Sequence, residues 1–338
     1  MEHEDVTIRR GRRSGLPMMI AVHSRALGPA VGGVRMRHYA DWRDGMEDAL
    51  RLSEAMTYKC AAADLAFGGG KSVIALDRPL TPELRQAALE DLGDLIASLD
   101  GSYLAGPDVG TGPADMVVLR QRTPHVFCLP EEQGGTGSSS IPTAVGVLAA
   151  LRAGARHVFG SESLDGRTVV ISGMGSVGSL VAKELPGARV IVSDVDRTRR
   201  DPAYEWVEPE EALRTPADVF VPAAVGGVFD PQTAAEVGAR LVVGPANNQL
   251  AADSVADLLA QRGITWVPDF VASAGGVVYT LAREIERLSH DEAMRRVEAI
   301  GSTVDTVLAG DGNPLDNALN LAKERLTRPA LPAGAASR

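Results

Sequence analysis

A glycine pattern that follows a β-branched run most constrains how this chain can fold. The sequence TVVISGMGSVGSLVAKEL carries Gly173, Gly175 and Gly178 in G-x-G-x-x-G spacing, between a predicted strand over Thr168–Ser172 and an apolar helix. In that setting the first glycine permits a tight turn, and the second lets the backbone approach a pyrophosphate. The third allows the helix to pack closely on the strand. The pattern therefore predicts a dinucleotide-binding loop.

The residue after the next predicted strand bears on which dinucleotide binds. That strand spans 190–193 and is followed by Asp194, whose carboxylate can accept hydrogen bonds from a ribose 2′-hydroxyl and would repel a 2′-phosphate. This favours NAD over NADP. Arg197, Arg199 and Arg200 argue the other way, because a nearby arginine can accommodate NADP. A glycine turn that binds no cofactor is the structural alternative.

Strand–helix alternation surrounds this fingerprint and gives the fold class. Helices and strands alternate after the linker-like QGGTGSSS segment at 133–140, which predicts an α/β fold with a doubly wound parallel sheet. The crossover after Asp194 has little helical period and is predicted to be shortened. The expected divisions are residues 1–140, a Rossmann domain over 141–290, C-terminal helices over 291–327, and a disordered tail over 328–338.

The N-terminal part has its own predicted elements. Buried strands are expected over 16–22 and 72–76, and a helix over 42–59. A second helix is expected to begin at the N-cap Thr81 and to run to about residue 99. The segment GPDVGTGPAD, at 106–115, is predicted to be a loop.

The segment MTYKCAAADLAFGGGKSVI suggests proton chemistry. Three glycines precede Lys71 beside a buried strand, and Lys59 lies twelve positions earlier. Two neighbouring lysines lower each other's pKa, burial lowers it further, and such a lysine can act as a general base. Lys71 does not fit a Walker phosphate loop, because position 65 is Leu65. Lys59 could equally be a solvated helix-end charge, and Asp108 could shuttle protons or cap a turn.

Composition excludes several classes of function. The 338-residue chain has a formal net charge of −10. An acidic chain lacks the positive charge that nucleic-acid binders place against phosphates, so DNA or RNA is not an expected partner. Its two cysteines, Cys60 and Cys128, have no CxxC spacing, and the histidines have no ligand spacing, so no metal site is expected. No secretory signal and no apolar run of about 18 residues is visible, so a cytoplasmic protein without membrane contact is expected.

Taken together, the motifs resemble a known family. LGPAVGGVRM, MTYK, LAFGGGKSVI, GPDVGT, GMGSVG, GPANNQ and VPDFVASAGG are similar to segments of the glutamate/leucine/phenylalanine/valine dehydrogenases. The linker form GTGSSSIPT looks closest to the phenylalanine enzymes of that family. One departure is Ser273, where the family usually has an asparagine before A-G-G.

The resemblance implies a division of labour among residues. It makes residues 1–140 a substrate-binding, catalytic and oligomerisation domain, with the C-terminal helices packing back toward it. Lys59 would hold the substrate α-carboxylate beside Gly32 and Gly33. Lys71 would be the catalytic acid/base and Asp108 its proton-transfer partner. The cofactor-binding residues implied are Arg35, Asp108, Ser139, Thr143, Gly173, Gly175, Ser176, Val177, Gly178, Asp194, Val195, Ala224, Val225 and Asn247.

The resemblance also implies a reaction and a substrate class. Hydride would pass from Cα of an L-amino acid to NAD, and Lys71 would activate the water that releases ammonia and the 2-oxo acid. A side-chain pocket lined by Val31, Ala105 and the Val277–Val278 pair would be small and apolar, which disfavours glutamate. Asn247 would bridge substrate and nicotinamide. The two domains are expected to close over the reactants.

Alternatives remain open at this point. Phenylalanine is favoured by the linker, with leucine, valine, other branched-chain residues or tryptophan as alternative substrates. A hydroxy-acid dehydrogenase would commonly use a histidine base, and no histidine here has a matching context. A non-catalytic NAD-binding regulator is the alternative of another class. A homo-oligomer is expected, with the number of subunits open.

Overall fold

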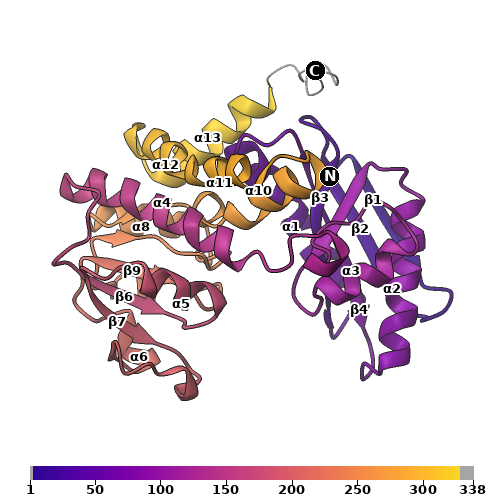
Figure 1. The fold of residues 1–338 in the computed structure, drawn as a ribbon, viewed down its shortest axis with the longest axis horizontal. Coiled ribbons are helices and arrows are strands. Elements are labelled where there is room, and N and C mark those ends of the chain that lie inside the picture. Colours follow the sequence, from indigo (N-terminus) through magenta and orange to yellow (C-terminus); the bar gives the residue numbers. More distant parts are fainter. Residues whose placement is uncertain (1–2, 328–338) are drawn as a thin grey trace. The chain divides into compact units, whose positions relative to one another are not determined.

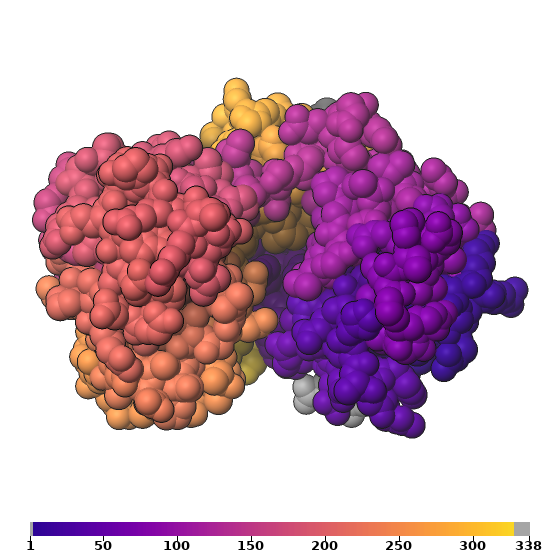
Figure 2. Space-filling view, turned by 90° about the horizontal axis from the view of Figure 1, so that it is seen from below, coloured from indigo at the N-terminus to yellow at the C-terminus, as the bar shows by residue number. Residues whose placement is uncertain are grey.

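The computed structural model describes residues 3–327, which form two compact units (Figure 1). Among these residues, the first unit comprises 3–138, 280–287 and 322–327, and the second comprises 139–279 and 288–321. The predicted tail over 328–338 lies outside the described residues. In the space-filling view, colour runs along the chain from indigo at the N-terminus to yellow, so that indigo to magenta marks residues 3–138 (Figure 2).

The first unit is built on a mixed five-stranded sheet in the order β1-β2-β4-β3-β5. β1 and β2 are antiparallel, as are β2 and β4, whereas β3 runs parallel to both β4 and β5. Its elements are β1 (Asp5–Arg10), β2 (Pro17–Ser24), β3 (Ala30–His38), α1 (Trp42–Ala62), β4 (Gly68–Leu76), α2 (Pro82–Ala97), β5 (Tyr103–Pro107), α3 (Pro113–Arg120), the short 3-10 helix η1 (Glu131–Gln133) and the π-helix η3 (Leu281–Ile285).

Helices cover both faces of this sheet because the strand residues alternate between two cores. On one face Met19, Ala21 and Val73 pack against α1, and on the other Met18, Ile20 and Ile74 pack with leucines of α2 and Met116 of α3. All nine residues of β4 are buried. Because β4 is buried on both faces, packing on each side restricts the directions that its side chains can take. Lys71 is one of the side chains restricted in this way.

The second unit is a doubly wound parallel sheet, as predicted. Its strands lie in the order β11-β10-β9-β6-β7-β8 and every neighbouring pair is parallel. Its elements are α4 (Ser140–Phe159), β6 (Thr168–Ser172), α5 (Ser176–Lys183), β7 (Arg189–Ser193), η2 (Arg197–Arg199), β8 (Glu205–Trp206), α6 (Pro209–Ala212), β9 (Val219–Pro222), α7 (Pro231–Ala234), β10 (Leu241–Val242), α8 (Ser254–Gln261), β11 (Thr265–Trp266), α9 (Asp269–Ala272), α10 (Gly275–Thr280), α11 (His290–Glu298) and α12 (Ile300–Ala309), with α13 (Pro314–Leu326) running into the first unit.

The structure confirms the shortened crossover after Asp194. Between β7 and β9 the chain forms only the single turn η2, the two-residue strand β8 and the single-turn helix α6. Trp206 lies in β8, at this edge of the sheet. The guanidinium of Arg200 lies 6.0 Å from the centre of the Trp206 ring and packs against it. The reduced crossover still places β8 parallel to β7 and returns the chain to β9, which pairs in parallel with β6.

The prediction of a loop over 106–115 was wrong at both ends. Gly106 and Pro107 pair with Gly33 and Val34 as the end of β5, and α3 begins at Pro113. Pro113 stands at the first helical position, where its missing N–H costs nothing, and the Asp115 carboxylate accepts from the Gly112 N–H at 2.8 Å. Asp108 is therefore held between a buried strand and a capped helix.

Candidate functional site

Lys71 and Asp108 form a buried pair in the first unit. Lys71 Nζ lies 2.7 Å from Asp108 Oδ2, and the Lys71 side chain is only 6% exposed. Lys71 lies within β4, whereas Asp108 immediately follows β5, and β3 lies between these two strands. The two residues that the sequence singled out for proton transfer are thus in direct contact.

Glycines on the intervening strand make this contact possible. A Cβ placed on Gly33 would stand 2.6 Å from the Cβ of Asp108 and 3.2 Å from Lys71 Nζ. A Cβ on Gly32 would stand 1.8 Å from the carbonyl oxygen of Gly70 on the neighbouring strand. Any side chain at either position would push the pair or its strands apart. The Gly-Gly of the GGVRM motif is therefore a packing requirement of the Lys71–Asp108 pair.

The electrostatics of the pair suit proton exchange. Burial lowers the pKa of Lys71 below its ordinary value, and Asp108 opposes that shift only in part. Burial raises the pKa of Asp108, but the cations of Lys71 and Arg35 outweigh it and hold the carboxyl below its ordinary range. A lysine that loses its proton readily thus lies beside a carboxylate that stays ionised.

The remaining residues predicted for the substrate lie in different parts of the chain. Lys59 occupies the last turn of α1, and its charge contributes to lowering the pKa of Lys71, as the sequence predicted. Val31 and Ala105 are fully buried on adjacent strands β3 and β5. Val277 is half-buried on α10, in the second unit, and the structure does not test whether it lines a substrate pocket.

The dinucleotide loop in the second unit has the geometry that its glycines require. Gly173 follows β6 with a φ of +114°, a conformation that favours glycine, and a Cβ on Gly178 would stand 1.9 Å from the Gly173 carbonyl oxygen. At Gly175, which precedes α5, the nearest atom to an added Cβ is a guanidinium nitrogen of Arg199 at 3.8 Å. The backbone of Gly175 is therefore open to a ligand, and this cradle fits a pyrophosphate at the start of α5.

Asp194 is held at the end of β7 by the same loop. Its carboxylate accepts hydrogen bonds from the backbone N–H groups of Met174 at 2.7 Å and Asp196 at 2.8 Å. Arg199 adds an ion pair at 3.1 Å. Burial raises the pKa of Asp194, but these bonds outweigh it, so the carboxyl titrates below its ordinary range. Arg199, which could accommodate the 2′-phosphate of NADP, is thus paired with Asp194, the carboxylate that would repel this phosphate.

The other predicted cofactor residues gather near the carboxyl ends of the second sheet. A Cβ on Gly173 would stand 2.6 Å from the Ala224 N–H, which brings the loop after β9 against the loop after β6. Val225 and Val195 are largely exposed there, although both are large apolar side chains. In an open parallel sheet, ligands bind at this edge, where the strand order reverses.

Ser273, the departure from the family pattern, contacts another predicted site residue. Its hydroxyl donates to Oδ1 of Asn247 at 3.2 Å. Ser139 and Thr143, at the start of α4, lie beside Gly276 of α10, where an added Cβ would stand 2.7 Å from the Thr143 hydroxyl. The Ser273 hydroxyl therefore helps to fix the side-chain oxygen of Asn247.

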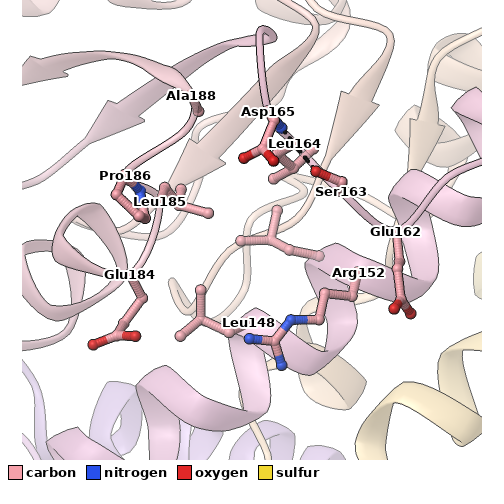
Figure 3. Close-up of a pocket in the computed structure, with 11 residues that line it drawn as sticks. Leu148, Arg152, Glu162, Ser163, Leu164, Asp165, Glu184, Leu185, Pro186 and Ala188 are labelled. Carbon is pink, nitrogen blue, oxygen red and sulfur yellow. Dashed lines mark hydrogen bonds between the residues drawn. The ribbon is translucent and has the colours of Figure 1, made fainter.

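A hollow of about 170 Å³ in the second unit lies away from these residues. Figure 3 shows its lining, which includes Leu148 and Arg152 of α4, Asp165 before β6, and Glu184 and Pro186 before β7. This is the amino-terminal edge of the sheet, opposite to the fingerprint loop. The hollow is therefore not the dinucleotide site.

Residues 3–327 contain neither a candidate metal-binding cluster nor a helix that could span a membrane. No group of three or more His, Cys, Asp or Glu side chains there is arranged to hold a metal ion. No helix of the described part is long and apolar enough to cross a membrane.

Arg35 occupies a position that the sequence did not reveal. Its Nε donates to Asp108 Oδ2 at 2.9 Å, and its NH1 group donates to Asp48 of α1 at 3.0 Å. The cofactor contact that the family resemblance implies for Arg35 stays a prediction. Asp48 was not identified at all, because it is one of several charged residues on α1 and nothing in its spacing marks it.

Comparison with known proteins agrees with this arrangement. Residues 3–125 match the sequence model described as "Glu/Leu/Phe/Val dehydrogenase, dimerisation domain", and residues 188–292 match "Glutamate/Leucine/Phenylalanine/Valine dehydrogenase". A phenylalanine dehydrogenase from Lysinibacillus sphaericus is 40% identical over 290 residues, covering 82% of this chain and 75% of that protein. The chain belongs to the Glu/Leu/Phe/Val dehydrogenase family. It is therefore an amino acid dehydrogenase, an oxidoreductase dependent on NAD or NADP.

Other relatives of this dehydrogenase differ in the amino acid that their names give. A leucine dehydrogenase from Geobacillus stearothermophilus is 37% identical over 315 residues, covering 91% of this chain and 85% of that protein. The crystal structure of L-tryptophan dehydrogenase from Nostoc punctiforme matches with a TM-score of 0.83 and 30% identity over 96% of each chain. Both the two-domain α/β fold and the amino-acid dehydrogenase activity predicted from the sequence are thus confirmed.

Proposed function

We propose that this dehydrogenase oxidises an apolar L-amino acid, with phenylalanine favoured, to its 2-oxo acid and ammonia, and catalyses the reverse reductive amination. The observation that carries the proposal is the buried contact of Lys71 Nζ with Asp108 Oδ2 at 2.7 Å. The phenylalanine dehydrogenase relative and the GTGSSSIPT linker support the choice of phenylalanine. Leucine, valine and tryptophan are the next candidates, in line with the names of the other relatives.

The residues of the first unit divide the work on the amino acid. Lys59 binds the α-carboxylate, beside the backbone of Gly32 and Gly33. Lys71 takes a proton at Nζ from the water that attacks the oxidised Cα, since its lowered pKa makes the neutral amine accessible. Asp108 passes that proton from Lys71 to the departing amine, and its lowered pKa favours release of the proton and keeps the carboxylate ionised between turnovers.

NAD is the cofactor that the second unit fits. The cradle at Gly173, Gly175 and Gly178 would hold the pyrophosphate, and Asp194 would face the adenosine ribose. When bound, NAD supplies the acceptor for the hydride that leaves Cα. The exposed side chains of Val195 and Val225 offer apolar surface at the same edge of the sheet. Ser139, Thr143, Ser176, Val177, Ala224 and Asn247 complete the proposed cofactor contacts.

A homo-oligomer is also proposed, formed through the first unit. The support is the family description of residues 3–125 as a dimerisation domain. The number of subunits does not follow from that description.

Oxidation of NADH tests the function. We would supply phenylpyruvate and the 2-oxo acids of leucine, valine, tryptophan and glutamate, each with and without ammonium. The proposal expects ammonium-dependent turnover that is fastest with phenylpyruvate and negligible with 2-oxoglutarate. Turnover that does not need ammonium would overturn the amino-acid reaction. Binding of NADH without any turnover would favour a regulatory protein.

A further inference from the structure

We infer that Arg35, held in place by Asp48, is a positioning residue that orients Asp108 against Lys71. This inference rests on the proposed function, because it assigns a task within the same site. It concerns a chain of contacts that runs from α1 through β3 to the residue that follows β5.

Arg35 bridges two carboxylates that lie on different elements. Its Nε binds Asp108 Oδ2 at 2.9 Å and its NH1 group binds Asp48 Oδ2 at 3.0 Å. Asp108 Oδ2 also receives Lys71 Nζ at 2.7 Å, so both cations meet one oxygen atom. The Arg35 side chain is 13% exposed, which limits screening by water. A planar guanidinium that binds two acceptors in fixed directions restricts where Oδ2 can lie.

Asp48 is itself secured by two further donors. The hydroxyl of Tyr39 donates to its Oδ2 at 2.8 Å, and Arg51, one turn along α1, donates to its Oδ1 at 2.8 Å. Burial raises the pKa of the Tyr39 phenol and Asp48 raises it further, so the hydroxyl remains a donor. The pKa of Asp48 lies below its ordinary value, because these donors outweigh its burial. The far end of the bridge is therefore an ionised, fixed carboxylate.

The bridge also affects the charges of the reacting pair. Arg35 lowers the pKa of Asp108 by stabilising the carboxylate, and it lowers the pKa of Lys71 by repelling the ammonium. The other charges acting on Lys71 are Asp108 and Lys59. Loss of the Arg35 cation should therefore raise both pKa values, and the rising limb of the deamination pH profile should move to higher pH.

The test separates charge from geometry with two variants of one residue. Arg35→Met removes the cation, whereas Arg35→Lys keeps it but offers a single nitrogen that cannot span both carboxylates. Arg9→Met is the matched control, because Arg9 is an exposed arginine on β1, a strand of the same sheet. For each variant we would measure kcat and KM against pH, and titrate the Asp108 carboxyl by ¹³C NMR, assigned with Asp108→Asn.

The expected results are distinct for the three variants. Arg35→Met should lower kcat about 10- to 100-fold with little change in the amino-acid KM, since misplacement by about 1 Å can cost that much. It should also raise the pKa of Asp108 and move the rising limb upward. Arg35→Lys should lower kcat but leave the limb in place, and Arg9→Met should match the wild type.

Other outcomes would overturn the inference. An Asp108 titration unchanged in Arg35→Met, with a raised KM for NAD, would make Arg35 a cofactor contact instead. If Arg35→Met does not fold, Asp48→Ala provides a second test of the bridge. In that variant kcat should fall severalfold at constant KM, and an unchanged kcat would count against the bridge. The Asp108 titration needs no substrate, so it decides the role of Arg35 even if ammonium-dependent turnover, and with it the proposed function, fails.

Discussion

Lys71 Nζ and Asp108 Oδ2 lie 2.7 Å apart across strand β3, which stands between β4 and β5. Two side chains can meet over an intervening strand only if the residue between them has no side chain in the way. Here that residue is Gly33. The reacting pair and the Gly-Gly motif are therefore one structural feature. Each depends on the other, so both can be tested by substitution.

The first prediction concerns Lys71 itself. Lys71→Ala should remove nearly all turnover, because the other cation beside Asp108, the Arg35 guanidinium, stays protonated and cannot act as a base, while NADH binding stays nearly intact in the second unit. Loss of a general base costs about 10²- to 10⁴-fold in rate. Steady-state kinetics and NADH fluorescence titration would check both parts. Lys323→Ala, an exposed lysine of α13, is the control, and a normal kcat in Lys71→Ala would remove Lys71 from the mechanism.

The second prediction concerns the gap in β3. Gly33→Ala should cut kcat strongly, since its methyl group would stand 2.6 Å from Asp108 Cβ and would force the pair apart. Overpacking of this kind costs about 1–3 kcal/mol of stability as well, measurable by urea unfolding. Gly112→Ala is the matched control, because nothing lies within 4 Å of its added Cβ. Normal activity in Gly33→Ala would show that the contact of Lys71 with Asp108 is not needed.

The third prediction concerns stability and pH at the N-terminal segment. The Asp91 carboxylate of α2 accepts from the backbone N–H groups of Arg13 and Ser14 and from the Ser14 hydroxyl, at 2.8–3.2 Å. Burial raises the pKa of Asp91, but these bonds outweigh it and hold the pKa below its ordinary value. A carboxyl with a depressed folded-state pKa stabilises the fold above its unfolded value and loses that contribution as pH falls through the folded value.

Asp91→Asn should therefore lower the free energy of unfolding by about 1.5–3 kcal/mol at neutral pH, since it weakens hydrogen bonds to a charged group. The difference from the wild type should shrink as the pH falls below about 4, the region where the unfolded carboxyl gains its proton. Urea unfolding at several pH values would measure it. Glu132→Gln, at an exposed position, should show no such pattern, and a constant difference at all pH values would contradict the prediction.

Much of the fold was predictable because local patterns decide it. The β-branched run at Thr168–Ser172 and the glycines after it mark β6 and its turn without reference to the rest of the chain. Helix α3 was missed, although Pro113 and Asp115 are ordinary start signals, because three glycines nearby were read as a loop. The segment 280–287 belongs to the first unit because Glu284 accepts from the backbone of Cys128 and Thr136, a pairing across about 150 residues that no local pattern contains.

The site divides in the same way. Lys71 and Asp108 each stand in a glycine-rich segment that is unusual enough to be noticed from sequence. Asp48 is an ordinary acidic residue on an amphipathic helix, and only the packing of α1 over β3 brings it to Arg35. Contacts between common residue types on distant elements carry no signal in a single sequence, and the Arg35 bridge consists entirely of such contacts.

The last prediction concerns the choice of cofactor. Asp194 follows β7 beside the pyrophosphate cradle, and the Met174 N–H, at 2.7 Å, fixes the direction of its carboxylate. We expect NAD to be preferred over NADP, because the carboxylate accepts from a ribose hydroxyl and repels a phosphate. Asp194→Ser should lower kcat/KM for NAD about 10-fold or more, the loss of one hydrogen bond to a charged group. It should raise the ratio of NADP to NAD activity, because Arg199 would then lose its closer carboxylate partner, at 3.1 Å, and keep only Asp196 at 3.4 Å.

Kinetics with both cofactors would measure this ratio in the wild type and in three variants. Glu210→Ser is the control, since Glu210 is also acidic, lies in the same crossover and is exposed. The double variant Asp194→Ser with Arg199→Ala should lose the gain with NADP while keeping the loss with NAD. If the wild type already prefers NADP, Arg199 rather than Asp194 decides the specificity, and removing Arg199 alone should then reverse the preference.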